Sequence, residues 1–245
     1  MSDAARSDVR FDQLGRLDYL EAWELQRQIH QRVWTGEDPG RVLLLEHPPV
    51  FTAGRRTPDE DRPVDAGGAP VIDVDRGGTI TFHGPGQLVG YPIVPLPDHV
   101  KIVDYVRRVE EALILACADF GVTTGRFPGR TGVWLPADDR GPERKIAALG
   151  IRVRRGIPMH GFALNCDVDL SWFDRIVPCS IADAGVTSLT TELDRDVPVA
   201  EALPVVRRRL AELLRWQPYE RTADYEPRPD PARTPRIPLL TPSAG

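Results

Sequence analysis

The sequence has few cysteines and no spacing that would make them metal ligands or disulfide pairs. Cys117, Cys166 and Cys179 are an odd number in 245 residues, and none belongs to a CxxC pair. This argues against a disulfide framework and against a cysteine-rich zinc site. The five histidines show neither HxxxH nor HExxH spacing, so we expect no metal site.

Signals for export, for membrane insertion and for nucleic-acid binding are also missing. Residues 1–8 lack the apolar core of a signal peptide, and the longest apolar run, residues 112–118, is far too short to span a membrane. Lys and Arg number 31 against 36 Asp and Glu, so the net charge is 31 − 36 = −5 and not the positive charge that nucleic acid attracts. We expect a cytoplasmic protein with no membrane and no nucleic-acid partner.

Apolar residues recur at helical spacing in three segments. The first follows the capping box Asp18-x-x-Glu21 and continues until Gly36. The second covers residues 102–120, places Cys117 on its core face and ends before Gly121. The third runs over about 199–216, with Pro204 early enough to be tolerated or to offset the helix start. Three helices are therefore predicted.

Runs of β-branched and apolar residues predict strands between these helices. They lie at 42–45, 71–75 and 79–83 and through most of 145–169, and we expect a tight turn to pair 71–75 with 79–83. This irregular order predicts an α+β fold, a mixed β-sheet flanked by helices. No polar linker divides the chain, so we expect one domain over residues 1–216, followed by a Pro-rich, extended or disordered tail over 217–245.

The common nucleotide-binding loops are absent. In Gly84-Pro85-Gly86-Gln87-Leu88-Val89-Gly90 the third glycine is one residue late for a dinucleotide fingerprint, no regular helix follows, and no GxxxxGK[ST] occurs. Residues 76–90 do hold five glycines around a strand, which would let backbone approach a ligand closely; a pair of glycine turns is the commoner meaning of such a pattern. His83 and His160 are each followed by glycine, at expected strand ends.

Two residues could carry covalent chemistry. Cys179 lies outside the predicted helices and strands, after Pro178, which suits a nucleophile that meets a carbonyl, although a buried inert thiol is commoner by residue type. Lys145 enters an apolar strand of small residues, where the alternative is a lysine whose stem reaches out to water.

Five segments, in this order along the chain, resemble the lipoyl(octanoyl) transferases. They are Arg76-Gly77-Gly78-x-x-x-x-His83-Gly84-Pro85-Gly86-Gln87, Gly129-Arg130-Thr131-Gly132-Val133-Trp134, Lys145-Ile146-Ala147-Ala148-Leu149-Gly150, His160-Gly161-Phe162-Ala163-Leu164-Asn165 and Pro178-Cys179. With matching residues in 19–26 and 46–52, the resemblance covers about residues 18–189 and leaves out the Pro-rich tail.

The resemblance implies the catalytic fold of biotin and lipoate protein ligases. It implies an enzyme that takes an octanoyl or lipoyl group from the phosphopantetheine thioester of acyl carrier protein and places it on a specific lysine. The acceptors would be the lipoyl domains of 2-oxoacid dehydrogenases and the glycine cleavage H protein. Such an enzyme needs neither ATP nor a metal, and we expect a monomer.

The resemblance also assigns roles to individual residues. Cys179 corresponds to the nucleophile that carries the acyl group, Lys145 to its partner and His160 to an accessory residue. The positions that correspond to the acyl-binding site are Arg76, Gly77, Gly78, Thr79, Ile80, Thr81, Phe82, His83, Ala148, Leu149, Gly150, Gly161, Phe162 and Ala163. The family pattern predicts glycine after the cysteine, whereas this chain has Ser180, so we expect a loop that is strained or shaped differently there.

Two other functions stay open at this point. An ATP-dependent lipoate or biotin ligase shares the fold and the lysine, but it proceeds through an acyl-adenylate and needs no thiol. A non-catalytic module that binds the carrier protein and only sequesters acyl chains would tolerate the replacement of Cys179 by serine. Arg152, Arg154 and Arg155 are expected on one strand face, where they either dock an acidic acyl carrier protein or form a solvated surface.

Overall fold

The main β-sheet is mixed, as the sequence predicts. The computed structural model describes residues 9–176 and 184–226. Within that part of the chain, one sheet runs in the spatial order β1-β2-β6-β10-β9-β8-β7, and β11 pairs in parallel with β9. The strands are β1 (Arg10–Arg16), β2 (Arg41–Glu46), β6 (Gln87–Ile93), β7 (Gly125–Phe127), β8 (Arg130–Leu135), β9 (Arg144–Arg154), β10 (Ile157–Asn165) and β11 (Gly185–Val186).

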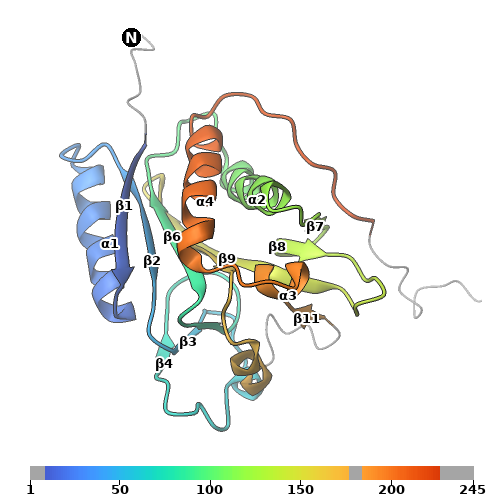
Figure 1. Cartoon of the computed structure of the whole chain (residues 1–245). Helices are drawn as coiled ribbons and strands as arrows, with labels where there is room; N and C mark the ends of the chain where they lie inside the picture. Colours follow the sequence, from blue (N-terminus) through green and yellow to red (C-terminus); the bar gives the residue numbers. More distant parts are fainter. Residues whose placement is uncertain (1–8, 177–183, 227–245) are drawn as a thin grey trace, which may run out of the picture.

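Helices cover both faces of this sheet (Figure 1). Helix α1 (Tyr19–Trp34) packs on one face, while α2 (Ile102–Asp119) and α4 (Val199–Leu213) pack together on the other. The short helix α3 (Leu189–Leu193) precedes α4, which continues through Pro204. The three predicted long helices are confirmed. None of the helices in the described ranges is long and apolar enough to cross a membrane.

Burial on both faces explains the unbroken apolar run in β2. Val42 and Leu44 face the core formed with α2 and α4, whereas Leu43 and Leu45 face the core formed with α1. A strand that alternates between two apolar layers has no polar side, so its sequence loses the usual alternation.

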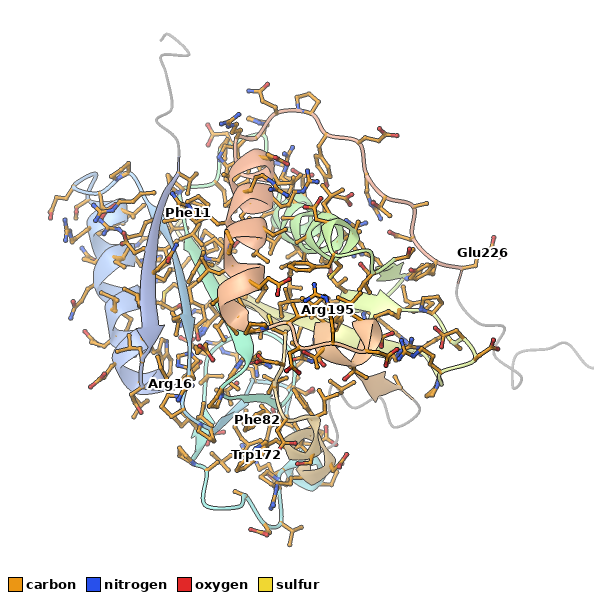
Figure 2. All side chains as sticks on the ribbon, in the orientation of Figure 1. Phe11, Arg16, Phe82, Trp172, Arg195 and Glu226 are labelled. Carbon is orange, nitrogen blue, oxygen red and sulfur yellow. The ribbon has the colours of Figure 1, made fainter. Side chains whose placement is uncertain are left out.

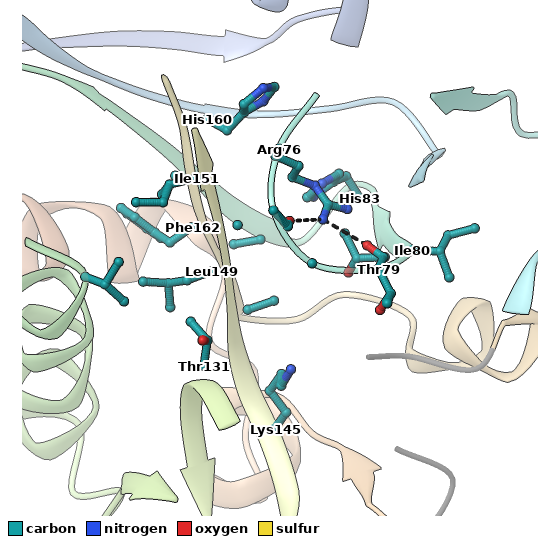
Figure 3. Close-up of a pocket in the computed structure, with 18 of the residues that line it drawn as sticks. Arg76, Thr79, Ile80, His83, Thr131, Lys145, Leu149, Ile151, His160 and Phe162 are labelled. Carbon is teal, nitrogen blue, oxygen red and sulfur yellow. Dashed lines mark hydrogen bonds between the residues drawn. The ribbon is translucent and has the colours of Figure 1, made fainter. Parts of the chain in front are cut away.

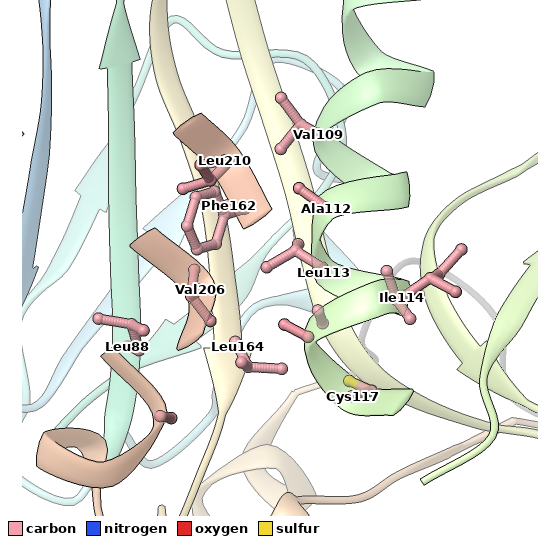
Figure 4. Close-up of a cluster of buried hydrophobic side chains, with 14 of the residues drawn as sticks. Leu88, Val109, Ala112, Leu113, Ile114, Cys117, Phe162, Leu164, Val206 and Leu210 are labelled. Carbon is pink, nitrogen blue, oxygen red and sulfur yellow. The ribbon is translucent and has the colours of Figure 1, made fainter. Parts of the chain in front are cut away.

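The larger core forms where α2 and α4 meet the sheet (Figure 4). Leu113 and Cys117 of α2 pack with Phe162 and Leu164 of β10. Cys117 is fully buried, so its predicted place on the core face is confirmed, and burial raises the pKa of its thiol to about 12. Cys166, directly after β10, is equally buried and its pKa is also raised by burial. Neither thiol is suited to act as a thiolate at neutral pH.

A second, smaller sheet corrects one prediction. Strands β4 (Val71–Asp73) and β5 (Thr81–His83) do not pair with each other, because β3 (Val50–Ala53) lies between them, parallel to β4 and antiparallel to β5. The segment between them is therefore a wide loop, residues 74–80, and not a tight turn. Gly77 N–H in this loop donates to Ile151 C=O of β9, which ties the small sheet to the large one.

The start of the Pro-rich segment is extended and packs against the domain. Residues 217–226 contain no helix or strand, and Figure 2 shows them as far as Glu226. Thr222 N–H donates to Glu111 Oε1 at 3.1 Å, and Tyr225 N–H donates to Arg126 C=O at 2.7 Å. This part of the segment therefore supplies hydrogen-bond partners to the Glu111 carboxylate of α2 and to the backbone of β7.

Candidate active site

A cavity of about 660 Å³ lies beside the edge of β9, against the 74–80 loop. It gathers nearly every residue that the resemblance assigns to the acyl site, together with Lys145 and His160. The members of that predicted set that line the cavity are Arg76, Gly77, Gly78, Thr79, Ile80, Thr81, His83, Ala148, Leu149, Gly150, Gly161, Phe162 and Ala163.

Phe82 is the exception, because it does not line the cavity. Its ring stacks on Trp172 with the centroids 4.9 Å apart and packs with Phe51 in a separate cluster (Figure 2). Side chains alternate along a strand, so Thr81 and His83 face the cavity while Phe82 between them faces away. That alternation was readable in the sequence and would have removed Phe82 from the predicted set.

The cavity wraps around an edge of β9 that β8 does not cover. The register of β8 with β9 stops at Val133 opposite Ala147, so residues 148–151 of β9 have no β8 partner. Figure 3 shows side chains on both sides of the strand at this point. We call the side under α2 the α2-side limb and the other the α1-side limb. The α2-side limb is lined by Val106, Thr131, Leu149, Ile151 and Phe162; the α1-side limb is lined by Tyr19, Arg76, His83, Tyr91, Ala148, Gly150, His160, Gly161 and Ala163.

A β-bulge aims Lys145 at the α1-side limb. Val133 pairs with Ala147 and Trp134 pairs with Lys145, so β9 contains one residue more than β8 at this point. Ile146 and Ala147 both enter the core under α2 and α4. Lys145 consequently projects from the opposite face, where it is 8% exposed and its Nζ lies 4.6 Å from the centroid of the Trp134 ring. Bulges commonly re-aim a side chain in this way next to active sites.

Two glycines allow the loop and a neighbouring strand to approach the cavity wall. A Cβ at Gly150 would lie 2.9 Å from Arg76 Cδ and 3.1 Å from Gly77 O. A Cβ at Gly161 would lie 2.1 Å from Gly90 O. Any side chain at these positions would push the backbone apart, so both glycines maintain the close approach that shapes the α1-side limb.

Arg76 shapes the cavity from within its own loop. Its Nη2 donates to Thr52 O at 2.7 Å and to Thr52 Oγ1 at 2.9 Å, and its Nη1 donates to Thr79 O at 2.9 Å. Nη1 also donates to Gly77 O at 3.0 Å, so the guanidinium joins two carbonyls of the loop to Thr52 of β3, and Figure 3 shows the bonds to the loop. The guanidinium, which also lines the cavity, therefore braces the 74–80 loop.

Tyr19, His83 and Tyr91 give part of the α1-side limb polar walls, and further polar groups lie behind them. His47 Nε2 lies 2.8 Å from Tyr91 Oη, and His83 Nδ1 lies 2.7 Å from Gln87 Oε1. Tyr19 stacks on His83 with the ring centroids 6.1 Å apart. Burial lowers the pKa of His47 to about 4 and, with the neighbouring His47 as a second cause, the pKa of His83 to about 3; it raises the pKa of Tyr19 to about 12. At neutral pH these side chains are neutral hydrogen-bonding groups.

His160 lies inside β10 and not at a strand end, which corrects the prediction. Its φ of +58° is in the left-handed region, and its N–H donates to Gln26 Oε1 at 2.7 Å. Its Nε2 lies 2.7 Å from Asp75 Oδ1, and Arg152 pairs with the same carboxylate. Burial, helped by the nearby Arg76 and Arg152 charges, lowers the pKa of His160 to about 3. His160 therefore joins α1, β10 and the 74–80 loop as a neutral residue.

Two of the three arginines after Gly150 share a strand face, because Arg152 and Arg154 are two residues apart in β9. Arg152 pairs with Asp75, and Arg154 ends β9. Arg155 is in the following turn at φ +55°, and its Cζ lies 3.5 Å from the centroid of the Trp34 ring. The predicted shared face therefore holds for Arg152 and Arg154, and the placement of Arg155 on the strand is corrected, because β9 ends at Arg154.

Sequence reasoning missed several residues of the cavity. Val106 and Ile151 lie on a predicted helix and a predicted strand but gave no sign of facing a cavity, and Tyr91 lies on β6, for which no strand was predicted. Tyr19, Thr131 and Trp134 belong to segments that carry the resemblance, yet no role was assigned to them. Cys179 and its neighbour Ser180 lie outside the described residues.

Comparison with known proteins identifies the family. Residues 18–211 match the model of the lipoyl protein ligase A/B catalytic domain. The chain is 64% identical to the octanoyltransferase of Salinispora arenicola, over 85% of this chain and 97% of that protein. It is 57% identical to the octanoyltransferase of Thermobifida fusca, over 91% of this chain and 97% of that protein. This chain belongs to the octanoyltransferase family. It is therefore an acyltransferase of protein lipoylation.

Solved structures place this octanoyltransferase family member among ligases of the same fold. A bipartite lipoate protein ligase from Thermoplasma acidophilum superimposes with a TM-score of 0.66 at 18% identity, covering 85% of this chain and 84% of that one. Lipoate-protein ligase A bound with ATP gives 0.65 at 16% identity, covering 90% and 89%. A biotin protein ligase from Aquifex aeolicus gives 0.52 at 14% identity, covering 84% and 70%. The predicted fold class is confirmed.

Proposed function

We propose that the chain transfers an octanoyl group from the phosphopantetheine thioester of acyl carrier protein to a lysine of a lipoyl domain, through a thioester on Cys179. The observation that carries the proposal is the placement of Lys145. A buried lysine, turned by a bulge into a cavity with a glycine-lined limb, suits an acyl group held at its carbonyl. The family membership supplies the reaction class.

The proposed reaction has two balanced steps. The Cys179 thiolate attacks the donor thioester carbon, a new C–S bond forms, and the carrier's pantetheine sulfur leaves as a thiolate that takes up a proton. The ε-amine of the acceptor lysine then attacks the Cys179 thioester, an amide bond forms, the Cys179 sulfur leaves, and the amine gives up a proton. Covalent catalysis divides one slow aminolysis into two easier transfers.

Lys145 carries protons in this scheme. As a neutral amine it takes up the proton of the Cys179 thiol, and the ammonium so formed stabilises the thiolate beside it. It then gives this proton to the departing pantetheine sulfur, returns to the neutral amine and takes up the proton of the incoming amine.

The remaining expectations belong to this proposal. The donor is octanoyl-acyl carrier protein, and the acceptors are lipoyl domains of 2-oxoacid dehydrogenases and the glycine cleavage H protein. The reaction uses neither ATP nor a metal, and the enzyme works as a cytoplasmic monomer.

Intact-mass analysis tests the proposal directly. The chain is mixed with octanoyl-acyl carrier protein without ATP, and we expect one octanoyl adduct, which a lipoyl domain then accepts on lysine. Cys179→Ser should form no thioester adduct, while Cys117→Ser, a substitution of a core thiol, should keep it. An adduct that forms only with ATP would support the ligase instead. An adduct that Cys179→Ser retains would show that another residue carries the acyl group.

A further inference from the structure

The two proposed transfer steps give no part to the α2-side limb, although the resemblance counts two of its walls, Leu149 and Phe162, among the acyl-binding positions. Its walls come from Val106 of α2, Thr131 of β8, Leu149 and Ile151 of β9, and Phe162 of β10. Lys145 and the predicted acyl-binding loop are on the other side of β9 (Figure 3). Resting on the proposed function, we propose that this limb binds the pantetheine arm of the acyl donor, with its amide groups against the edge of β9.

The cavity is too large for the acyl group alone. An octanoyl group has eight carbons and one oxygen. If each of these heavy atoms takes roughly the 30 Å³ that one water molecule occupies, the group needs roughly 270 Å³. The cavity measures about 660 Å³. Since Lys145 and the glycine-lined wall place the acyl group on the α1 side, the α2-side limb remains for another part of a substrate.

The connection between the limbs fits a thioester donor. Both limbs meet at residues 148–151, where β9 has no β8 partner. A donor whose carbonyl lies near Lys145 would extend its acyl chain into the α1-side limb. Its sulfur and the arm attached to it would then continue across the strand edge into the α2-side limb.

The exposed edge of β9 offers backbone groups that an amide can pair with. Ile151 C=O points away from β10, because it accepts the Gly77 N–H at 3.0 Å. Backbone groups two residues apart on a strand point the same way, so Leu149 directs its N–H and C=O toward the cavity. A pantetheine arm carries two amides separated by short alkyl links, and it can bind a strand edge as an added peptide strand does. The apolar walls Val106 and Ile151 suit the alkyl links.

The limb has an opening onto the surface where the carrier would sit. Thr131 is exposed at this end of β8. On α2, Ile102 and Val103 are 52% and 69% exposed, one turn before Val106. Exposed apolar side chains beside a cavity mouth are typical of a surface that a partner covers.

Two synthetic donors that differ only in the arm test this inference. Octanoyl-pantetheine carries the whole arm, whereas octanoyl-N-acetylcysteamine carries the same thioester and one amide. We expect the chain to use octanoyl-pantetheine with a kcat/KM about tenfold higher, a difference of about 1.4 kcal/mol. Val106→Trp fills the limb and should abolish this preference while transfer from octanoyl-N-acetylcysteamine continues.

The controls separate a filled limb from a damaged fold. Val103→Trp adds the same bulk to the same helix outside the cavity and should keep the preference. Thr131→Tyr narrows the limb from an exposed strand position and should reproduce Val106→Trp without lowering the melting temperature. The inference is overturned if the unmodified chain shows no preference or if Val106→Trp lowers both donors equally. Failure with octanoyl-acyl carrier protein itself would instead overturn the proposed function.

Discussion

Lys145 Nζ lies 4.6 Å from the centroid of the Trp134 ring. Both side chains lie on the face of the sheet opposite the core under α2 and α4, although the residues next to them in β8 and β9 belong to that core. The extra residue Ile146 makes this possible. It adds a second consecutive core residue before Ala147 and so turns Lys145 to the face of Trp134. One extra residue in β9 thus decides that Lys145 faces the cavity and does not enter the core.

Replacing Lys145 tests its chemical part. Lys145→Met keeps an unbranched stem against Trp134 but removes the ammonium, so we expect octanoyl transfer to fall by about 10²–10⁴, the usual contribution of a group that moves a proton. The measurement is single-turnover transfer from octanoyl-acyl carrier protein, with the melting temperature as a control. Lys145→Arg keeps the positive charge but cannot give up its proton, so it should recover thiolate formation without recovering amine transfer. Full activity of Lys145→Met would remove Lys145 from the mechanism.

Gly132 keeps the β8 backbone beside this lysine. Its φ is +126°, and a Cβ there would lie 2.7 Å from Ala147 O and 3.3 Å from Lys145 Cε. We expect Gly132→Ala to lower both stability and transfer activity, because it adds a backbone clash to the left-handed strain of about 1–2 kcal/mol. Chemical denaturation measures the first effect and single-turnover kinetics the second.

Gly121→Ala is the matched control for that substitution. Gly121 also has a positive φ, +87°, but a Cβ there would meet nothing within 4 Å. The Gly121→Ala variant should lose stability only through the left-handed backbone strain, and it should keep its transfer activity. If the two variants lose equal stability and both remain active, close packing at Gly132 does not position Lys145.

Local signals in the sequence predicted much of the fold. Asp18 caps α1 through its side chain, which accepts from Leu20 N–H and Glu21 N–H, and this motif is contained in four residues. The core place of Cys117 followed from helical spacing alone. Motif resemblance brought together the cavity residues, which the chain separates by almost ninety positions, because the family pattern already holds tertiary information.

Features that depend on distant partners could not be predicted. The strand β3 lies between β4 and β5, and nothing in residues 71–83 indicates a partner twenty residues earlier. The bulge at Ile146 appears only when β8 and β9 are aligned. Arg76 could not be recognised as a brace, because its acceptors include Thr52 of another strand. In each case the determining contact is non-local.

Buried neutral histidines predict a loss of stability in acid. The pKa values of His47 and His83 are lowered to about 4 and about 3, whereas histidine in an unfolded chain titrates near about 6.5. As the pH falls, these histidines take up protons in the unfolded chain before they do so in the folded chain. The free energy of unfolding that is present above about pH 6.5 is therefore lost as the pH falls toward 3–4. Each such histidine should lower the free energy of unfolding by about 2 kcal/mol between pH 7 and pH 5.

Urea unfolding at pH 7 and pH 5 measures this loss. His83→Gln removes one titrating group, so the difference between the two pH values should shrink by about 2 kcal/mol relative to the unmodified chain. His99→Gln, a substitution outside this polar cluster, is the control and should leave the difference unchanged. An unaltered difference in His83→Gln would mean that His83 does not bind the proton on unfolding.

The extended segment 217–226 should be part of the folded domain and not a dispensable tail. Arg126 is fully buried between Glu110 and Glu111, and its Nη1 donates to Thr222 O at 3.1 Å. Thr222 in turn donates to Glu111, and Glu110 Oε1 accepts the Gly132 N–H at 2.9 Å. The segment is therefore linked through two buried carboxylates to the strand that carries Gly132.

Two truncations test that link. Removing residues 217–245 deletes the Thr222 C=O that accepts from Arg126 and the Thr222 N–H and hydroxyl that donate to Glu111. Each lost hydrogen bond to a charged group should lower the free energy of unfolding by about 1.5–3 kcal/mol. We expect a large fall in melting temperature and, through Glu110 and Gly132, a fall in transfer activity at temperatures where the shortened chain is still folded. Removing residues 227–245 alone keeps all these contacts and should leave both properties unchanged. Equal melting temperatures for the two shortened chains would show that residues 217–226 contribute nothing to the domain.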